Sequence, residues 1–165
     1  LKIKNIFTRV LKGHIAVVSS KFKKKFTGAN LDNKARYWLK QVGLDYAHGT
    51  GHGVGFFLNV HEGPQSISKN NNVFLKTGMI LSNEPGYYKK NSYGIRIENL
   101  IYVRKDKNYS FFENLTYVPI DLDMINFDLL NKSEENYIKN YHSTIYLKYK
   151  NYLTSNEKRW LRKLF

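Results

Sequence analysis

The sequence predicts an α+β fold, in which helical segments flank a mainly antiparallel sheet. Apolar residues recur at helical spacing near both ends of the chain. Between them, apolar runs at 79–84 and 94–103 have the length and composition of strands. Pro85, Gly86 and a polar turn at 89–92 join these runs, which indicates a hairpin.

Two helices are expected in the N-terminal region. The second spans residues 31–42 and stops at Gly43, a frequent residue just beyond helix ends. A basic connector at 21–30 joins it to the first helix, which spans residues 3–18. The inward-facing residues of that first helix are Ile3, Ile6, Phe7, Val10, Leu11, Val17 and Val18.

The last third of the chain begins with a strand at 111–120, closed by Pro119. It then turns helical. Ser133 is expected to cap a helix that runs to about Tyr149, and Ser155 to cap a last short helix.

Composition narrows the class of protein. Hydrophobic residues make up 42% of the 165 residues, enough for a core, and the absence of cysteine excludes disulfides and thiol catalysis. The net charge of +14 raises the question of a nucleic-acid partner, but the lysines are spread along the chain. We therefore favour a solvated basic surface and expect neither nucleic acid nor a membrane as partner.

Two carboxylates of the hairpin are the first chemical signal. Glu84 ends the first run, and Glu98 lies in the second, two residues after Arg96. Alternate residues of a strand share a face, so Arg96 and Glu98 point the same way, and the hairpin can bring Glu84 to that face. Carboxylates in an apolar sheet need a cation, which is either a metal ion or Arg96.

Histidines in glycine-rich sequence favour the metal. The segments are HGTGHGVG at 48–55 and NVHEGP at 59–64. Glycine at every second position around His52 is expected to leave room for a metal and a substrate. Imidazole with carboxylate suits Mn, Co, Zn or Fe better than Ca. His14 and His142, each alone on a helix, are expected to be structural.

These segments, with EPGYY at 84–88 and GIRIEN at 94–99, resemble the catalytic domain of aminopeptidase P. This is the X-prolyl aminopeptidase group of the pita-bread (creatinase/aminopeptidase-like) metallopeptidases. The resemblance runs from VLKGHIA at 10–16, through FENLTYVPI at 112–120, to Trp160 and Leu161. It implies a partial catalytic domain at 1–120 and a helical C-terminal extension at 121–165.

The resemblance also implies roles for individual residues. Family members bind two divalent metal ions, commonly Mn²⁺, which activate a water for peptide hydrolysis. Glu84 would be the general base, His48 and His61 would contact substrate and the developing oxyanion, and Tyr88 and Arg96 would hold ligands in place. The metal ligands carried over are His52, Glu84 and Glu98.

Two family ligands have no match. The family site has five protein ligands, and two are aspartates well upstream of the histidine. The acidic residues before His52 are Asp32 and Asp45, both too close to it and lacking the family context. We therefore expect a fragment that lacks the N-terminal part of the fold, with an incomplete metal site and little peptidase activity alone.

The resulting functional hypothesis is a cytoplasmic metalloprotease that releases the N-terminal residue of peptides with proline second. One alternative is an inactive pita-bread module that binds RNA, ribosomes or histones, and another is a prolidase-type dipeptidase. The C-terminal aromatic residues either mediate a homodimer or cover the domain's own core: Tyr137, Tyr141, Tyr146 and Trp160.

Overall fold

The computed structural model describes residues 2–57 and 59–165. These residues form two compact units, of which the first is Arg9–Thr116. The second unit consists of the residues up to Thr8 together with Tyr117–Phe165. Helix α1 (Ile3–Val18), predicted with these bounds, starts in the second unit and continues into the first. The domain boundary after residue 120 stays a prediction.

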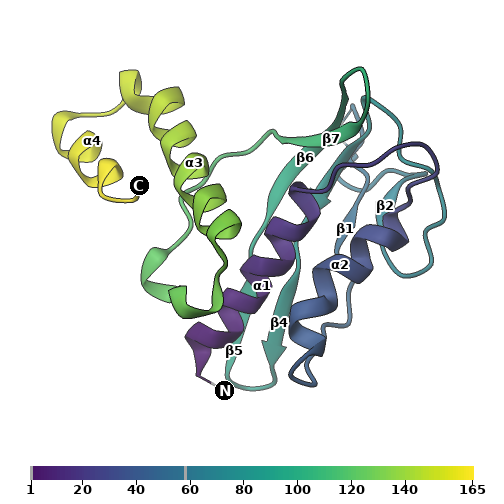
Figure 1. Cartoon of the computed structure of the whole chain (residues 1–165), viewed down its shortest axis with the longest axis horizontal. Coiled ribbons are helices and arrows are strands. Elements are labelled where there is room, and N and C mark those ends of the chain that lie inside the picture. Colours follow the sequence, from purple (N-terminus) through teal and green to yellow (C-terminus); the bar gives the residue numbers. More distant parts are fainter. Residues whose placement is uncertain (1, 58) are drawn as a thin grey trace. The chain divides into compact units, whose positions relative to one another are not determined.

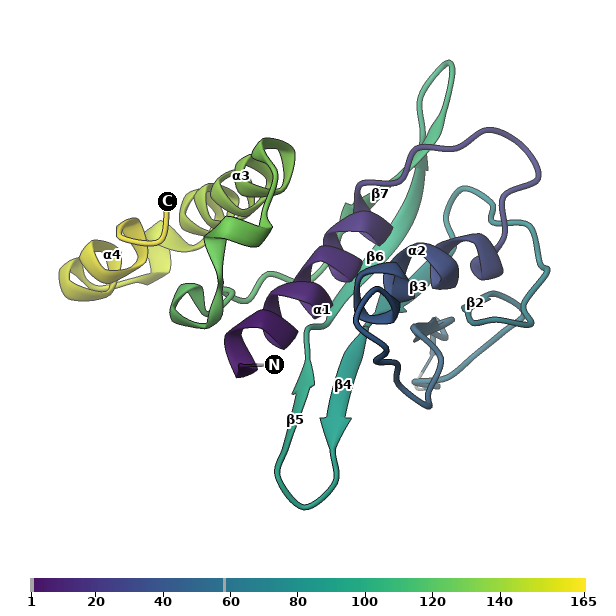
Figure 2. The ribbon, with the colours of Figure 1, turned by 60° about the horizontal axis from the view of Figure 1, so that its bottom comes forward.

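The first unit contains an antiparallel sheet covered by helices, so the predicted α+β class is confirmed. Helix α2 (Gly28–Lys40) lies beside α1 on one face of the sheet (Figures 1 and 2). Strands β3, β6 and β7 pair in that order, β4 pairs with β5, and β1 with β2. Their bounds are β1 Gly51–His52, β2 Ser66–Ile67, β3 Ile80–Asn83, β4 Gly86–Lys89, β5 Tyr93–Arg96, β6 Asn99–Lys105 and β7 Ser110–Asn114.

One register runs through the whole predicted hairpin. Ile80 pairs with Tyr102 at one end and Lys89 with Tyr93 at the other. The pairing is interrupted at Pro85, which has no N–H to donate, although its carbonyl accepts from the Ile97 N–H at 3.3 Å. The interruption lies next to Glu84, so the ladder is open where the candidate carboxylates are.

Successive side chains of this hairpin alternate between the face that packs against the helices and the face that carries the candidate site. Odd-numbered residues of β3 and β6 point toward the helices, where Asn83 Nδ2 donates to the His14 carbonyl of α1 at 3.0 Å. Even-numbered residues point to the opposite face. The fully buried apolar residues of this core are Val10, Leu11, Val17, Leu31, Ala35, Leu39, Ile67, Leu81, Ile101 and Val103.

Helix α2 begins earlier than predicted. It starts at Gly28 rather than Leu31, because the Asn30 side chain accepts the Thr27 N–H at 2.9 Å and fixes the first turn. Gly43 beyond its end has φ +72°, in agreement with its predicted role as the stop. The strand predicted at 111–120 is shorter, since β7 ends at Asn114.

The second unit has three 3₁₀ turns, Leu122–Met124, Phe127–Leu129 and Lys150–Tyr152, and helices α3 (Lys132–Tyr149) and α4 (Ser155–Arg162) among its described residues. Both predicted caps are wrong. Asn131 caps α3 through reciprocal bonds with Glu134, and Thr154 caps α4 through Glu157. Helices long and apolar enough to cross a membrane are absent from the described part of the chain.

His142 and Tyr141 of α3 are structural in this second unit. His142 Nε2 accepts the Ile120 N–H at 3.0 Å, and the Tyr141 hydroxyl bonds to the backbone of Val118. Tyr141 therefore covers its own unit's core, whereas Trp160 is 58% exposed. The homodimer stays a prediction.

His14 gives a prediction for pH dependence. Burial lowers the pKa of its imidazole to about 4, so folding favours the neutral ring. Between pH 6.5 and 4 the unfolded chain binds the proton and the folded chain does not, so stability falls as pH falls. We expect a loss of about 3 kcal/mol over that range, absent from His14→Gln. Urea unfolding at pH 7, 5.5 and 4 measures it, and parallel pH curves for the two proteins would contradict it.

Candidate active site

One face of the sheet collects most of the predicted site residues. The hairpin register places Glu84 opposite Glu98, between the pairs Asn83–Asn99 and Gly86–Arg96. Residues directly opposite in an antiparallel pair share a face, as do alternate residues along each strand. The residues placed on this face by the register are Ser82, Glu84, Tyr88, Arg96 and Glu98.

His52 joins this face from β1. Its backbone N–H donates to Ser82 Oγ at 2.9 Å, and the Glu84 N–H donates to the Thr50 carbonyl at 2.8 Å. These bonds align β1 beside β3. Close approach requires glycine here, since a Cβ on Gly51 would lie 1.9 Å from the Ser82 carbonyl oxygen.

The sequence-based explanation of the glycines was therefore wrong for Gly51 and Gly53. A Cβ on Gly53 would lie 2.0 Å from the Glu62 carbonyl oxygen, which belongs to the segment that carries His61. These glycines let three backbone segments pack closely. They position His52 and His61 rather than leave space for a metal or substrate.

The carboxylate of Glu84 is the centre of the polar contacts. Glu84 is 8% exposed, and its Oε1 accepts from Ser82 Oγ at 2.8 Å. Arg96 Nη1 lies 3.5 Å from Oε2. Ser82, which the sequence analysis did not single out, thus holds both the backbone of His52 and the carboxylate of Glu84. Its position two residues before Glu84 on a strand was the available signal.

The His52 ring faces the Glu84 carboxylate through Nε2. Its Nδ1 lies 3.0 Å from the Gly53 carbonyl, which only accepts, so Nδ1 carries the proton. Nε2 then faces Glu84 Oε1 at 3.4 Å. The ring of His61 packs edge-on against His52, with centroids 4.1 Å apart. Two acceptors facing each other need a cation between them, either a second proton or a metal ion.

A directed chain of hydrogen bonds joins His48 to the same site. Arg96 Nε donates to the Tyr88 hydroxyl at 2.8 Å, which in turn donates to His48 Nε2 at 3.0 Å. His48 Nδ1 donates to the Gly49 carbonyl at 2.7 Å. The Tyr88 hydroxyl bond is the main reason why the pKa of Arg96 is raised, and the charges of Glu84 and Glu98 add to it.

The side chain of Glu98 does not form a metal-binding cluster with the other two predicted ligands, His52 and Glu84. It is exposed, across the ladder from Glu84. Over residues 2–57 and 59–165, the structure shows no group of three or more His, Cys, Asp or Glu side chains placed to hold one metal ion. The structure thus brings His52 and Glu84 together and leaves Glu98 beside them.

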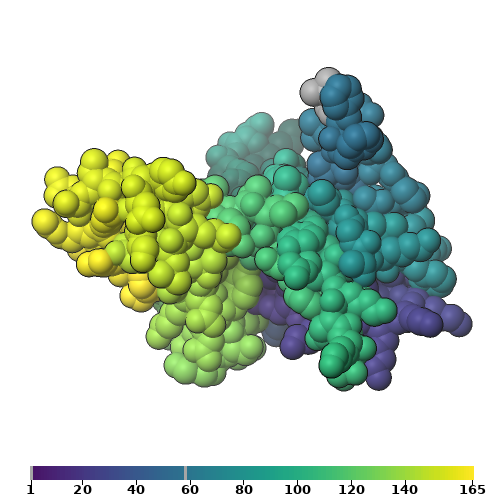
Figure 3. All heavy atoms as spheres, turned by 90° about the horizontal axis from the view of Figure 1, so that it is seen from above, coloured from purple at the N-terminus to yellow at the C-terminus, as the bar shows by residue number. Residues whose placement is uncertain are grey.

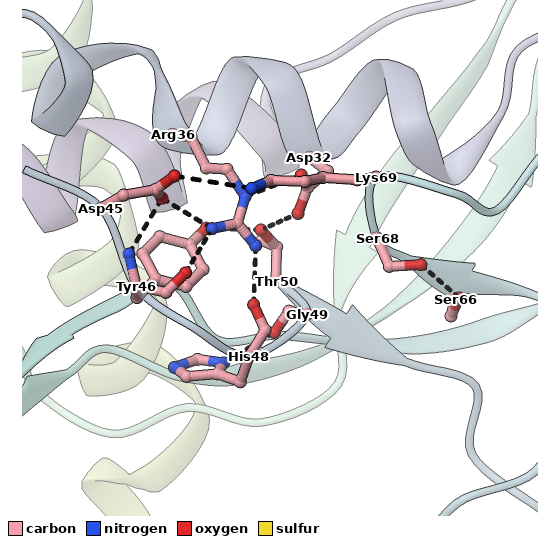
Figure 4. Close-up of polar contacts among 10 residues, drawn as sticks. All are labelled: Asp32, Arg36, Asp45, Tyr46, His48, Gly49, Thr50, Ser66, Ser68 and Lys69. Carbon is pink, nitrogen blue, oxygen red and sulfur yellow. Dashed lines mark hydrogen bonds and ion pairs between the residues drawn. The ribbon is translucent and has the colours of Figure 1, made fainter.

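A buried arginine that was not predicted from the sequence supports the loop before His52 (Figure 4). Arg36 donates to Asp32 at 2.7 Å and to the carbonyls of Tyr46 and His48 at 2.7 and 2.6 Å. It also donates to Asp45 at 2.7 Å. Against the opposing effect of burial, the bonds to Asp32 and Asp45 raise the pKa of Arg36.

Both upstream aspartates, Asp32 and Asp45, accept hydrogen bonds from Arg36 in this network. Asp32 is fully buried and accepts from Arg36 and from Thr50 Oγ1 at 2.7 Å. Against the opposing effect of its own burial, the Arg36 hydrogen bond lowers the pKa of Asp45. They anchor the segment that carries His48 rather than point to Glu84, in keeping with their exclusion as metal ligands. The spacing of Asp32 and Arg36, four residues apart on a helix, was the signal for this pair.

His52 and Glu84 fit a first-row divalent metal. Ligands about 2.1 Å from one such ion lie roughly 3–3.4 Å apart, which matches their 3.4 Å separation. The hydrogen bond at His52 Nδ1 fixes the ring orientation that a ligand needs, and Ser82 fixes the carboxylate. One imidazole with carboxylates is a donor set for Mn, Co, Zn or Fe.

Comparison with known proteins assigns the family. Residues 2–105 match metallopeptidase family M24, and residues 108–164 match the C-terminal region of that family. The chain belongs to metallopeptidase family M24. A probable Xaa-Pro aminopeptidase P from Coprinopsis cinerea is 47% identical to this M24 chain, over 95% of the chain and 27% of the relative. Aminopeptidase P2 from Arabidopsis thaliana is 47% identical, over 96% of the chain and 24% of the relative.

A solved structure extends the likeness to the fold. The X-prolyl aminopeptidase from Caenorhabditis elegans, described as cytosolic with a di-nuclear active site, superposes with a TM-score of 0.90 at 38% identity. It covers 98% of the M24 chain, which spans 28% of that enzyme. The prolidase from Pyrococcus furiosus covers only 70% of the chain, with a TM-score of 0.61 at 32% identity. The predicted pita-bread fold is confirmed, as part of a longer fold.

Proposed function

We propose that this M24 chain is the C-terminal part of an X-prolyl aminopeptidase, which releases the N-terminal residue of peptides with proline second. The chain is homologous to Xaa-Pro aminopeptidases and spans about a quarter of their length. The observation that supports the catalytic part of the proposal is the 3.4 Å approach of His52 Nε2 to a Glu84 carboxylate held by Ser82.

In this proposal His52, Glu84 and Glu98 are three of the ligands of two divalent ions, with Mn²⁺ as the candidate. The other ligands are two aspartates outside this chain. When bound, the ions acidify a water and polarise the scissile carbonyl. A di-nuclear site is described for the Caenorhabditis elegans relative.

The remaining steps fall to side chains of this face. Glu84 takes the proton of the attacking water, and its carboxylate is held in place by Ser82 Oγ at Oε1 and by Arg96 Nη1, 3.5 Å from Oε2. His61 is exposed beside His52 and can donate to the oxyanion. Both ring nitrogens of His48 are already bonded, so it acts through Tyr88, which with Arg96 orients Glu84.

The two alternatives receive less support. A prolidase-type dipeptidase would resemble prolidases at least as well, yet the aminopeptidase structure covers 98% of the chain and the prolidase 70%. An inactive binding module has no need of the joined contacts among His52, Ser82, Glu84, Arg96 and Tyr88. We also propose a cytosolic location, by analogy with the Caenorhabditis elegans enzyme.

A paired assay tests this function. This chain, and the same chain extended upstream along its own coding sequence (the extended chain), are given a tripeptide with proline second, with added Mn²⁺ or with a chelator. We expect cleavage only by the extended chain with Mn²⁺, because only that form supplies a full set of ligands. Cleavage of an Xaa-Pro dipeptide instead of the tripeptide would indicate a prolidase. A folded extended chain that cleaves neither peptide would contradict the proposal.

A further inference from the structure

The basic connector between α1 and α2 is fixed to the sheet by Phe22. Phe22 is 5% exposed, and its backbone exchanges two hydrogen bonds with Ser110 of β7, at 2.9 and 2.7 Å. Its ring packs on Phe26 and Phe112. Because the phenylalanine is anchored, the lysines on either side of it are held at the surface rather than carried on a free loop.

Three segments then line an open basic cavity of about 640 Å³. They are the connector, the turn before β3 and the loop between β6 and β7, and Figure 3 shows connector and loop on one face. Thr77, Asn108 and Ser110 add neutral donors, and no carboxylate belongs to the lining. The cations that line this basic cavity are Lys23, Lys24, Lys76, Lys105 and Lys107.

Among the residues that the structure describes, these five ammonium groups have no anionic partner within ion-pair distance. The nearby Asp106 does not belong to the lining, and its Oδ1 accepts the N–H groups of Asn108 and Tyr109 at 2.8 and 2.7 Å. Five like charges around one concave surface repel one another, and a bound polyanion removes that repulsion.

The cations of this cavity can bind phosphate. All five are lysines, and a lysine ammonium binds phosphate oxygens as a compact point charge. Tyr109 is 42% exposed at its rim, with Lys23 Nζ 5.5 Å from the ring centre, so an aromatic surface accompanies the charge. The volume lies within the range of small-molecule sites.

We propose that the basic cavity binds a ligand that carries several phosphates, either a free polyphosphate such as a nucleoside triphosphate or the backbone of single-stranded RNA. The cavity is separate from the candidate active site. Lys105 lies six residues along β6 from Asn99, the neighbour of Glu98, which is about 20 Å on an extended strand. The proposal therefore stands independently of the peptidase function.

Calorimetric titration of the extended chain with tripolyphosphate, ATP and a short single-stranded RNA tests this site. We expect the double variant Lys105→Gln/Lys107→Gln to bind the probe on the order of tenfold more weakly at low salt. For RNA, the slope of log K against log salt concentration is expected to become shallower by about 1.4. The matched control is Lys89→Gln/Lys90→Gln, which removes the same charge at the opposite end of the hairpin (Figure 2).

The probes also separate the two sources of phosphate. Loss of tripolyphosphate and ATP binding in the cavity variant indicates a free polyphosphate site, and loss confined to RNA indicates a nucleic-acid site. Either result supports the proposal. Equal effects of the cavity and control variants, or no binding of any probe by the unaltered protein at low salt, overturns it. Circular dichroism confirms that both variants are folded.

Discussion

Replacing Glu84 by glutamine is expected to lower kcat/KM of the extended chain for an Xaa-Pro tripeptide by about a thousandfold. The amide cannot take the proton of water, and it removes a charge from the candidate metal site. The shape of the side chain is kept, and Ser82 Oγ can still donate to an amide oxygen, so the fold is expected to survive. Steady-state kinetics with saturating Mn²⁺ measure the effect.

The matched control for this prediction is Glu113→Gln. Glu113 is a half-exposed glutamate of β7 in the same unit, 3.0 Å from Arg104, and it has no place in the candidate site. We expect it to keep full activity. A Glu84→Gln protein that retains more than about a tenth of the activity would remove Glu84 from the roles of base and ligand.

Replacing Arg36 by methionine is expected to destabilise the protein by about 3–5 kcal/mol. The change leaves the fully buried Asp32 carboxylate without its cation, and it frees the carbonyls of Tyr46 and His48. Urea unfolding followed by circular dichroism measures the loss.

A second substitution distinguishes the charge from the packing. Adding Asp32→Asn to Arg36→Met removes the unpaired buried charge, so the double variant is expected to recover part of the lost stability. Arg104→Met, which breaks an exposed pair with Glu113, serves as the control and should leave the unfolding midpoint unchanged. An Arg36→Met protein as stable as the control would show that the network contributes little.

Local patterns in the sequence were sufficient for the helices and the hairpin. Apolar periodicity gave α1 its bounds, and two strand-like runs around Pro85 and Gly86 predicted the hairpin. The register that sets Glu84 opposite Glu98 is seen only in the structure. Caps were harder to locate, because several adjacent residues can bond the first turn. Asn131 and Thr154 do so instead of Ser133 and Ser155, since each exchanges bonds with a glutamate three residues later.

Contacts between distant segments could not be read from the sequence. The support of His48 by Arg36 depends on how α2 lies against the loop after it. The packing role of Gly51 depends on the Ser82 carbonyl, 31 positions away in number but adjacent in space. The motif resemblance named the site residues without these supports. Their roles as ligands and catalytic groups stay predictions.

Anomalous diffraction from crystals of the extended chain grown with Mn²⁺ tests the central claim most directly. We expect anomalous density beside His52 Nε2 and a Glu84 carboxylate oxygen, with Glu98 drawn in as a further ligand, and no such density in Glu84→Gln crystals. Manganese density elsewhere, with His52 and Glu84 joined only to each other, would contradict the assignment of this sheet face as a metallopeptidase site.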